Sequence, residues 1–256
     1  MGLKKLQEKT YKVFLYGLQK EIRFRGFTTK EQEILLECQP LNEIEENKQL
    51  TDKQKNNIIE SIIQIAEMCV IDDINIRKLT YFDLTHLFVE LRKVSVNEVV
   101  ELKYQLEHPN AEDERHRYET ISVAFKLDDV NFDIIKNDNL TIDIDNDEGI
   151  DYKIIMEYPT VEYMIENEKE IKENIVSTKL YGLVKGALID DEYTTKDDIS
   201  LSDWIETFNT FGMINQSKFI DFLKNLPEIE HTIVLQSKLF PDVTREVILK
   251  GIESFF

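Results

Sequence analysis

The sequence has 256 residues, of which 42% are hydrophobic and 10% aromatic. This composition is too apolar for a disordered chain, and the length suits one large domain or two smaller ones. There are 31 lysines and arginines against 50 aspartates and glutamates, which gives a formal net charge of −19. Because affinity for nucleic acid depends on cations that neutralise phosphates, and no local basic patch offsets this total, the charge argues against a nucleic-acid partner.

The cysteines and the apolar runs indicate the compartment. Cys38 and Cys69 are the only cysteines, and such sparse usage is typical of a reducing cytoplasm. The first residues lack the apolar run of a signal peptide, and no stretch approaches the roughly 20 apolar residues that span a bilayer. We therefore expect a soluble intracellular protein without a membrane partner.

The first predicted elements are an extended segment and a helix. Residues 11–27 are predicted to be extended, because apolar side chains alternate along them. The alternation is carried by Phe14, Tyr16 and Leu18. A helix is predicted to follow, with Thr28 or Thr29 as its N-cap and Glu31 in its first turn.

Two further helices and a strand are predicted between residues 51 and 104. A wide apolar stripe over 51–70 predicts a helix buried on one side. The stripe contains Ile58, Ile62, Ile65 and Cys69. The next stripe predicts a second helix, with Leu84, Leu87, Phe88 and Leu91 at helical spacing. From Val96 the apolar spacing changes to two, so this helix runs almost directly into a strand.

Residues 97–157 are predicted to be a β region. Short strands separated by polar turns favour antiparallel hairpins over crossover connections. The expected strands are 98–106, 117–127, 131–136, 140–145 and 152–158.

The remainder is predicted to be helical and to end in a hairpin. Helical stripes cover 161–175 and 180–188, and two short helices are predicted over 200–209 and 216–227. The final hairpin is formed by 229–238 and 245–256. Since helices and strands are segregated in blocks, the fold class is α+β rather than a doubly wound parallel sheet. The expected segments, 1–96, 97–157 and 158–256, form either one continuous domain or separate ones.

The acidic stretch 143–149 resembles a calcium-binding loop in part. Asp143, Asp145 and Asp147 match the first three ligand positions of an EF-hand loop. However, Gly149 falls one position late and Ile154 occupies the place of the closing glutamate. We therefore predict a solvated hairpin turn closed by Gly149 and no metal site.

No other pattern predicts catalysis. His108 and His116 have no standard zinc spacing, and the chain lacks a nucleophile elbow, a P-loop and a dinucleotide-binding motif. The acids of 190–192 are interpreted as a solvated loop. We therefore expect no catalytic residue, no cofactor and no enzymatic activity.

Three residues are candidates for partner binding. Arg92 lies at the predicted helix-to-strand junction, where it serves either as a structural clamp or as a contact to a partner. Phe255 and Phe256 end the chain. They either pack on the protein's own sheet or insert into a partner.

Several stretches together resemble the baseplate hub protein family of T-even-type bacteriophages. These are "EIRFRGFTTKEQEILL" (21–36), the long stretch 62–102, "FIDFLKNLP" (219–227) and the terminal "LKGIESFF" (249–256). The most specific positions are Arg25, Phe27, Glu31, Phe82, Asp83, Leu91 and Ser95.

The resemblance implies a late, non-enzymatic phage tail protein that takes part in virion morphogenesis. It implies an assembly chaperone of the baseplate hub that acts in the host cytoplasm through protein–protein contacts. The alternative is a permanent component of the hub in the virion. The implied partners are other tail or hub proteins, and the oligomeric state stays open.

The sequence departs from the family pattern in one respect. Relatives often carry Cys-x-x-Cys pairs after the strand at 98–102 and again before the terminal "SFF". Neither corresponding stretch here contains a cysteine, so tetrahedral sulfur ligation is impossible there. We therefore infer no metal site for this chain from the resemblance. We expect ladder hydrogen bonds and cross-strand pairs to hold these hairpins instead, with Tyr118, Ile121 and Val123 taking part.

Two other functions suit parts of the sequence. One is a metal-dependent hydrolase that uses the carboxylates of 143–151 or 190–192. The other is an acidic mimic of DNA, which suits the net charge but requires aligned acids. Lysines interspersed through most acidic stretches argue against that alignment.

Overall fold

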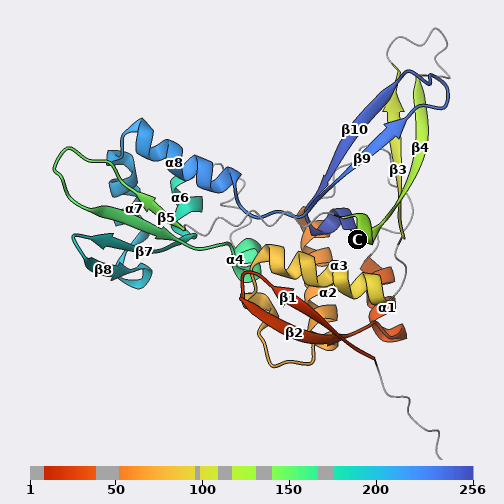
Figure 1. The fold of residues 1–256 in the computed structure, drawn as a ribbon, viewed down its shortest axis with the longest axis horizontal. Helices are drawn as coiled ribbons and strands as arrows, with labels where there is room; N and C mark the ends of the chain where they lie inside the picture. Colours follow the sequence, from red (N-terminus) through yellow and green to blue (C-terminus); the bar gives the residue numbers. More distant parts are fainter. Residues whose placement is uncertain are drawn as a thin grey trace, which may run out of the picture. The chain divides into compact units, whose positions relative to one another are not determined.

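A computed structural model describes residues 9–38, 52–95, 99–108, 117–130, 140–166 and 176–255. Helices and small antiparallel sheets alternate along the chain (Figure 1), and every strand pair in these residues is antiparallel. The predicted α+β class is therefore confirmed. The expected strand at 131–136 and part of the helical stripe at 161–175 lie outside the described residues.

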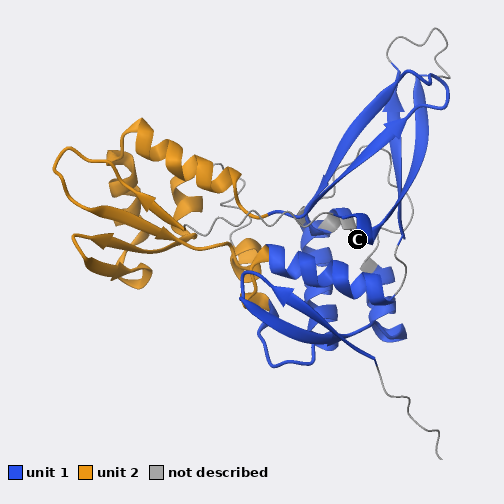
Figure 2. Cartoon of the chain, in the orientation of Figure 1, with its two compact units in different colours: residues 1–76, 82–133, 228–256 blue, residues 77–81, 134–227 orange. Residues whose placement is uncertain are grey.

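The chain divides into two units (Figure 2). Unit 1 contains residues 1–76, 82–133 and 228–256, and unit 2 contains residues 77–81 and 134–227. These boundaries differ from the segments expected from the sequence, because the C-terminal hairpin packs with strands that lie more than a hundred positions earlier. No helix among the described residues is long and apolar enough to cross a bilayer.

Unit 1 begins with a hairpin of β1 (Thr10–Leu15) and β2 (Lys20–Arg25). Val13 and Leu15 are buried, whereas Phe14 and Leu18 are exposed. The predicted extended backbone is confirmed over β1 and β2, but a turn at 16–19 that the sequence does not predict separates the two strands. The cause is a distant carboxylate. Asp83 accepts hydrogen bonds from the backbone N–H groups of Gly17, at 3.1 Å, and Leu18, at 2.9 Å. Because Asp83 of a distant segment holds this turn, the turn needs no turn motif in its own sequence.

Three helices pack beside this hairpin: α1 (Thr29–Cys38), α2 (Asp52–Cys69) and α3 (Tyr81–Ser95). The predicted stripes of α2 and α3 are confirmed, since their apolar side chains are almost completely buried. A short 3-10 turn, η1 (Ile76–Lys78), precedes α3. The predicted passage from helix to strand is also confirmed, because β3 begins at Val99.

Two hairpins complete unit 1 (Figure 1). They are β3 (Val99–Glu107) with β4 (Tyr118–Lys126), and β9 (Glu230–Gln236) with β10 (Thr244–Lys250). Their inward side chains form one core that also includes Val89 of α3. The expected cross-strand pairs are present, with Ile121 opposite Tyr104 and Val123 opposite Leu102. Short turns η3 (Leu127–Asp129) and η5 (Ile252–Phe255) follow the hairpins.

Unit 2 is a four-stranded antiparallel sheet with helices. The strand order is β5 (Thr141–Asp143), β6 (Tyr152–Met156), β7 (Val184–Ile189) and β8 (Glu192–Thr195). Its helices are α4 (Val161–Glu166), α6 (Val176–Tyr181), α7 (Leu201–Thr210) and α8 (Met213–Lys224), with a 3-10 turn η4 (Lys196–Asp198). Trp204 lies in the core, and its indole N–H donates to the Ser177 carbonyl at 2.7 Å.

The predicted helix over 180–188 is wrong. Leu180, Leu183, Val184 and Ala187 are buried as expected, but α6 ends at Tyr181 and β7 begins at Val184. These residues have helical spacing only by coincidence, because they span the end of one helix and the start of a strand. Close packing at two glycines accompanies the change: a Cβ at Gly182 would lie 1.9 Å from the Tyr163 ring, and one at Gly186 2.5 Å from the Thr194 carbonyl.

A tight turn joins β7 to β8 and carries the acids of 190–192. Asp190 and Asp191 have positive φ angles of 46° and 69°. Two-residue hairpin turns of this kind favour glycine at the second position. We expect Asp191→Gly to raise the free energy of unfolding of unit 2 by about 0.5–1 kcal/mol, because it removes the steric cost of a left-handed residue.

Urea unfolding followed by Trp204 fluorescence measures this effect, because Trp204 is the only tryptophan in the chain. Asp197→Gly is the matched control, since Asp197 lies in η4 and is not among the residues with positive φ. That change is expected to destabilise. Equal destabilisation by both substitutions would contradict the prediction.

Candidate interaction site

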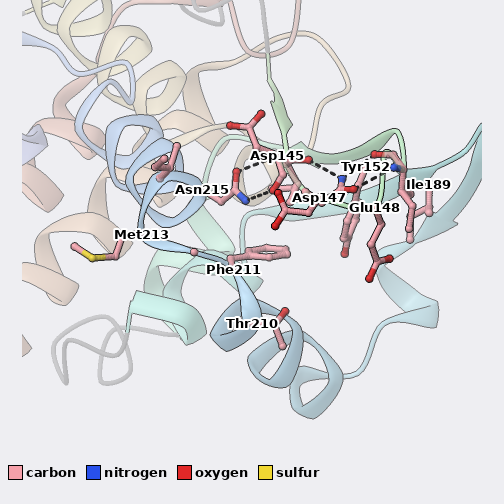
Figure 3. A pocket seen from close by; sticks show the side chains of 14 residues that line it. Asp145, Asp147, Glu148, Tyr152, Ile189, Thr210, Phe211, Met213 and Asn215 are labelled. Atoms are coloured by element: carbon pink, nitrogen blue, oxygen red, sulfur yellow. Dashed lines mark hydrogen bonds between the residues drawn. The ribbon is translucent and has the colours of Figure 1, made fainter.

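Unit 2 contains a hollow of about 990 Å³. Three parts of the chain line it: the acidic turn 144–150, the sheet residues Tyr152 and Ile189, and the junction of α7 and α8 at 210–215 (Figure 3). A volume of this size is in the range of pockets that bind ligands or side chains.

The acidic turn is a closed hairpin connection, as the sequence predicts. Gly149 has a φ of 73°, a conformation that glycine adopts without steric cost. The Asn146 side chain braces the turn: its amide nitrogen donates to the Ile150 carbonyl at 2.8 Å, and its oxygen accepts from the Ile150 N–H at 3.0 Å. These hydrogen bonds fix the shape of the turn.

The turn is attached to helix α8 through Asn215 (Figure 3). The Asn215 side chain accepts from the Asp145 N–H at 2.9 Å and donates to the Asp145 carbonyl at 2.7 Å, and it is buried. Lys218, one helical turn further along, donates to the Asp143 carbonyl at 2.7 Å. Because both walls are joined by hydrogen bonds, the hollow is preformed.

The hollow combines apolar and acidic side chains. Phe211 is buried and lies edge-on to Tyr152 at 6.0 Å between ring centroids, and burial raises the pKa of the Tyr152 hydroxyl. In the first turn of α8, Met213 is 88% exposed and Ile214 is 71% exposed. The carboxylates of the lining are on Asp145, Asp147 and Glu148, and no lysine or arginine is among its described lining residues.

The lining offers apolar and acidic side chains, which suits it to binding. The described residues of the hollow include no histidine, cysteine or serine. Across all the residues described, no group of three or more histidine, cysteine or acidic side chains is placed to hold a metal ion.

The motif residues that carry the family resemblance meet elsewhere, in unit 1. The Arg25 guanidinium donates to the Glu31 carboxylate at 2.8 Å and to the Met68 carbonyl at 2.9 Å. Glu31 also accepts from the Thr28 N–H at 2.6 Å, as in a capping box. The hydrogen bond from Arg25 lowers the pKa of Glu31 to about 2, in spite of its burial. This network joins β2 to α1 and α2.

Ser95 and Asp83 join α3 to the same hairpin. The Ser95 hydroxyl accepts from the Phe27 N–H at 2.7 Å and donates to the Leu91 carbonyl. Asp83 closes the turn between β1 and β2. Phe82 and Leu91 are buried. The motif residues thus hold the hairpin against three helices.

A comparison with protein-family models now identifies the chain. The model described as T4 bacteriophage base plate protein matches residues 8–256. The chain belongs to this family. No curated protein and no solved structure matches it. The resemblance seen in the sequence is thereby confirmed for a T4-type baseplate protein.

The partner-binding candidates of this baseplate protein differ in exposure. Arg92 is 8% exposed in the last turn of α3, and burial lowers its pKa. That position suits a structural clamp better than a contact to a partner. Phe255 ends η5, but its side chain and all of Phe256 lie outside the described residues.

A buried polar cluster joins the two hairpins of the baseplate protein. Glu119 accepts from the Ser237 hydroxyl at 2.6 Å and the Lys238 N–H at 2.8 Å, and it lies 3.1 Å from His108 Nε2. Burial raises the pKa of Glu119, but these hydrogen bonds outweigh it and lower the pKa to about 2.

This cluster links the two hairpins and does not have the order of a catalytic triad. In a catalytic triad the imidazole stands between the hydroxyl and the acid, whereas here both Ser237 and His108 approach the same carboxylate oxygen. No local pattern in the sequence predicts the cluster, because His108 and Ser237 are 129 positions apart.

We expect Asn215→Ala to lower the free energy of unfolding of unit 2 by about 1–3 kcal/mol, because it leaves the Asp145 N–H and carbonyl without their partner. Urea unfolding followed by Trp204 fluorescence measures the loss. Asn209→Ala is the control, since Asn209 is exposed on α7. If the two variants unfold at the same urea concentration, Asn215 does not hold the turn.

Proposed function

We propose that this baseplate protein is an assembly chaperone of the baseplate hub. It binds other tail or hub proteins in the host cytoplasm and turns over no small molecule. Membership of the baseplate family supports the tail role. The preformed hollow, which offers apolar and acidic groups without a catalytic arrangement, is the observation that carries the proposal.

The distribution of exposed apolar side chains favours transient over permanent contacts. Permanent interfaces are wide and apolar, like a core cut in half. Among the described residues, large exposed apolar side chains are instead spread over many elements. Examples are Leu36, Ile71, Tyr118, Tyr193, Val234 and Ile248. Such a surface suits a protein that is released after it has acted.

The carboxylates considered for a hydrolase have structural surroundings. Asp145 pairs with Lys218 at 2.9 Å, and Asp190 accepts from the Asp151 N–H at 3.1 Å. Both carboxylates are exposed to solvent. These surroundings support the non-enzymatic role.

Affinity capture of the tagged chain from infected cells tests the proposal. We expect hub proteins to be recovered from assembly intermediates, and finished virions to lack the chain by quantitative mass spectrometry. Stoichiometric chain in virions would instead establish a permanent hub component. Recovery of no tail protein would overturn both functions.

A further inference from the structure

We propose that the hollow of unit 2 binds a segment of a partner protein in which a lysine or arginine stands close to a large apolar residue. This inference rests on the proposed function and names the chemistry of the partner. The occupant is a polypeptide. Its basic side chain contacts the turn 144–150, and its apolar side chain packs against the first turn of α8.

The apolar part of the site is unusually exposed. Met213 and Ile214 are consecutive, and both are more exposed than any other large apolar side chain among the described residues. Burying one such side chain contributes about 1.5–3 kcal/mol. Phe211, whose side chain is mostly buried, lines the same hollow and adds to its apolar part.

Charge selects the partner. Asp147 and Glu148 are exposed at the hollow and have no ion pair among the described contacts, whereas Asp145 is already paired with Lys218. A cation that enters the hollow therefore meets two carboxylates and no lining cation. Opposite charges across an interface select the partner and speed its encounter.

The same charge disfavours two other occupants. A second copy of the chain carries a net charge of −19, so its average surface repels the acidic rim. A nucleic acid is repelled for the same reason. A basic segment of a different protein is the occupant that the charges favour.

Binding of peptides tests the inference. The probes are overlapping peptides that cover the baseplate and tail-tube proteins encoded by the same phage, and fluorescence anisotropy measures their affinity for the full chain. We expect the peptides that bind to contain a lysine or arginine near a large apolar residue, and their affinity to fall as ionic strength rises.

Two variants of the hollow and two matched controls locate the site. Asp147→Lys with Glu148→Lys, and separately Met213→Ser with Ile214→Ser, are each expected to weaken binding about tenfold or more. The charge control is Asp197→Lys with Glu206→Lys, which changes the net charge equally at exposed positions outside the lining. The apolar control is Val234→Ser, at an exposed strand position of unit 1.

Each outcome decides the inference. Unchanged affinity in both hollow variants, equal losses in the controls, binding only by neutral or acidic peptides, or binding by no peptide would each overturn it. If the hollow variants still capture hub proteins from infected cells, the chaperone role stands and the hollow is not its binding site. Circular dichroism checks that all variants are folded.

Discussion

Glu31→Ala is expected to lower the free energy of unfolding by about 3–5 kcal/mol, because it leaves the Arg25 guanidinium partly buried beside a vacated partner. Glu31 is 1% exposed and accepts hydrogen bonds from both Arg25 and Thr28. Its loss removes the link between β2 and the start of α1. Urea unfolding followed by far-UV circular dichroism measures the change.

The matched control is an exposed pair on the same hairpin. Lys12 and Glu21 lie 2.7 Å apart, with side chains 62% and 55% exposed. Exposed ion pairs contribute about 0–1 kcal/mol, so Glu21→Ala is expected to have little effect. If Glu31→Ala costs no more than Glu21→Ala, the motif network does not hold the hairpin.

Glu119→Gln is expected to make the free energy of unfolding fall less steeply as the pH is lowered. The folded pKa of Glu119, about 2, lies below its ordinary value of 4.5. Its ionised form therefore stabilises the folded state above the ordinary pKa, and this stability is lost as the pH falls toward 2. The shift corresponds to about 3 kcal/mol.

Between about pH 5 and pH 2 the wild type is expected to lose about 3 kcal/mol more than the Glu119→Gln variant. Glu31 has a similarly lowered pKa and titrates in both proteins, so it cancels in the comparison. Urea unfolding at a series of pH values provides the data. Parallel acid profiles for wild type and variant would contradict the hydrogen-bonded cluster.

The sequence predicts elements well where the signal is local. The stripe of α3 and the alternation of β3 each lie within one element, so both were found. The turn between β1 and β2 was missed because the group that closes it, Asp83, is 66 positions from Gly17. The strand β7 was mistaken for a helix because its burial mimics helical spacing.

The candidate site was predictable only in part. The acidic turn was predictable, and its interpretation as a hairpin turn closed by Gly149 agrees with the structure. The second wall of the hollow, at the junction of α7 and α8, was not predictable from the sequence. Asn215 lies 70 positions from Asp145, and no local pattern links the two residues. Met213 and Ile214 begin a helix, where exposed and buried apolar residues look alike in sequence.

Baseplate assembly in a phage that lacks this gene shows whether the chain is needed to build the hub. Sedimentation and electron microscopy of infected-cell lysates count completed baseplates. We expect hubs and baseplates to fail to form without the chain, and the wild-type gene supplied in trans to restore them. Normal numbers of baseplates in its absence would contradict a role in their assembly.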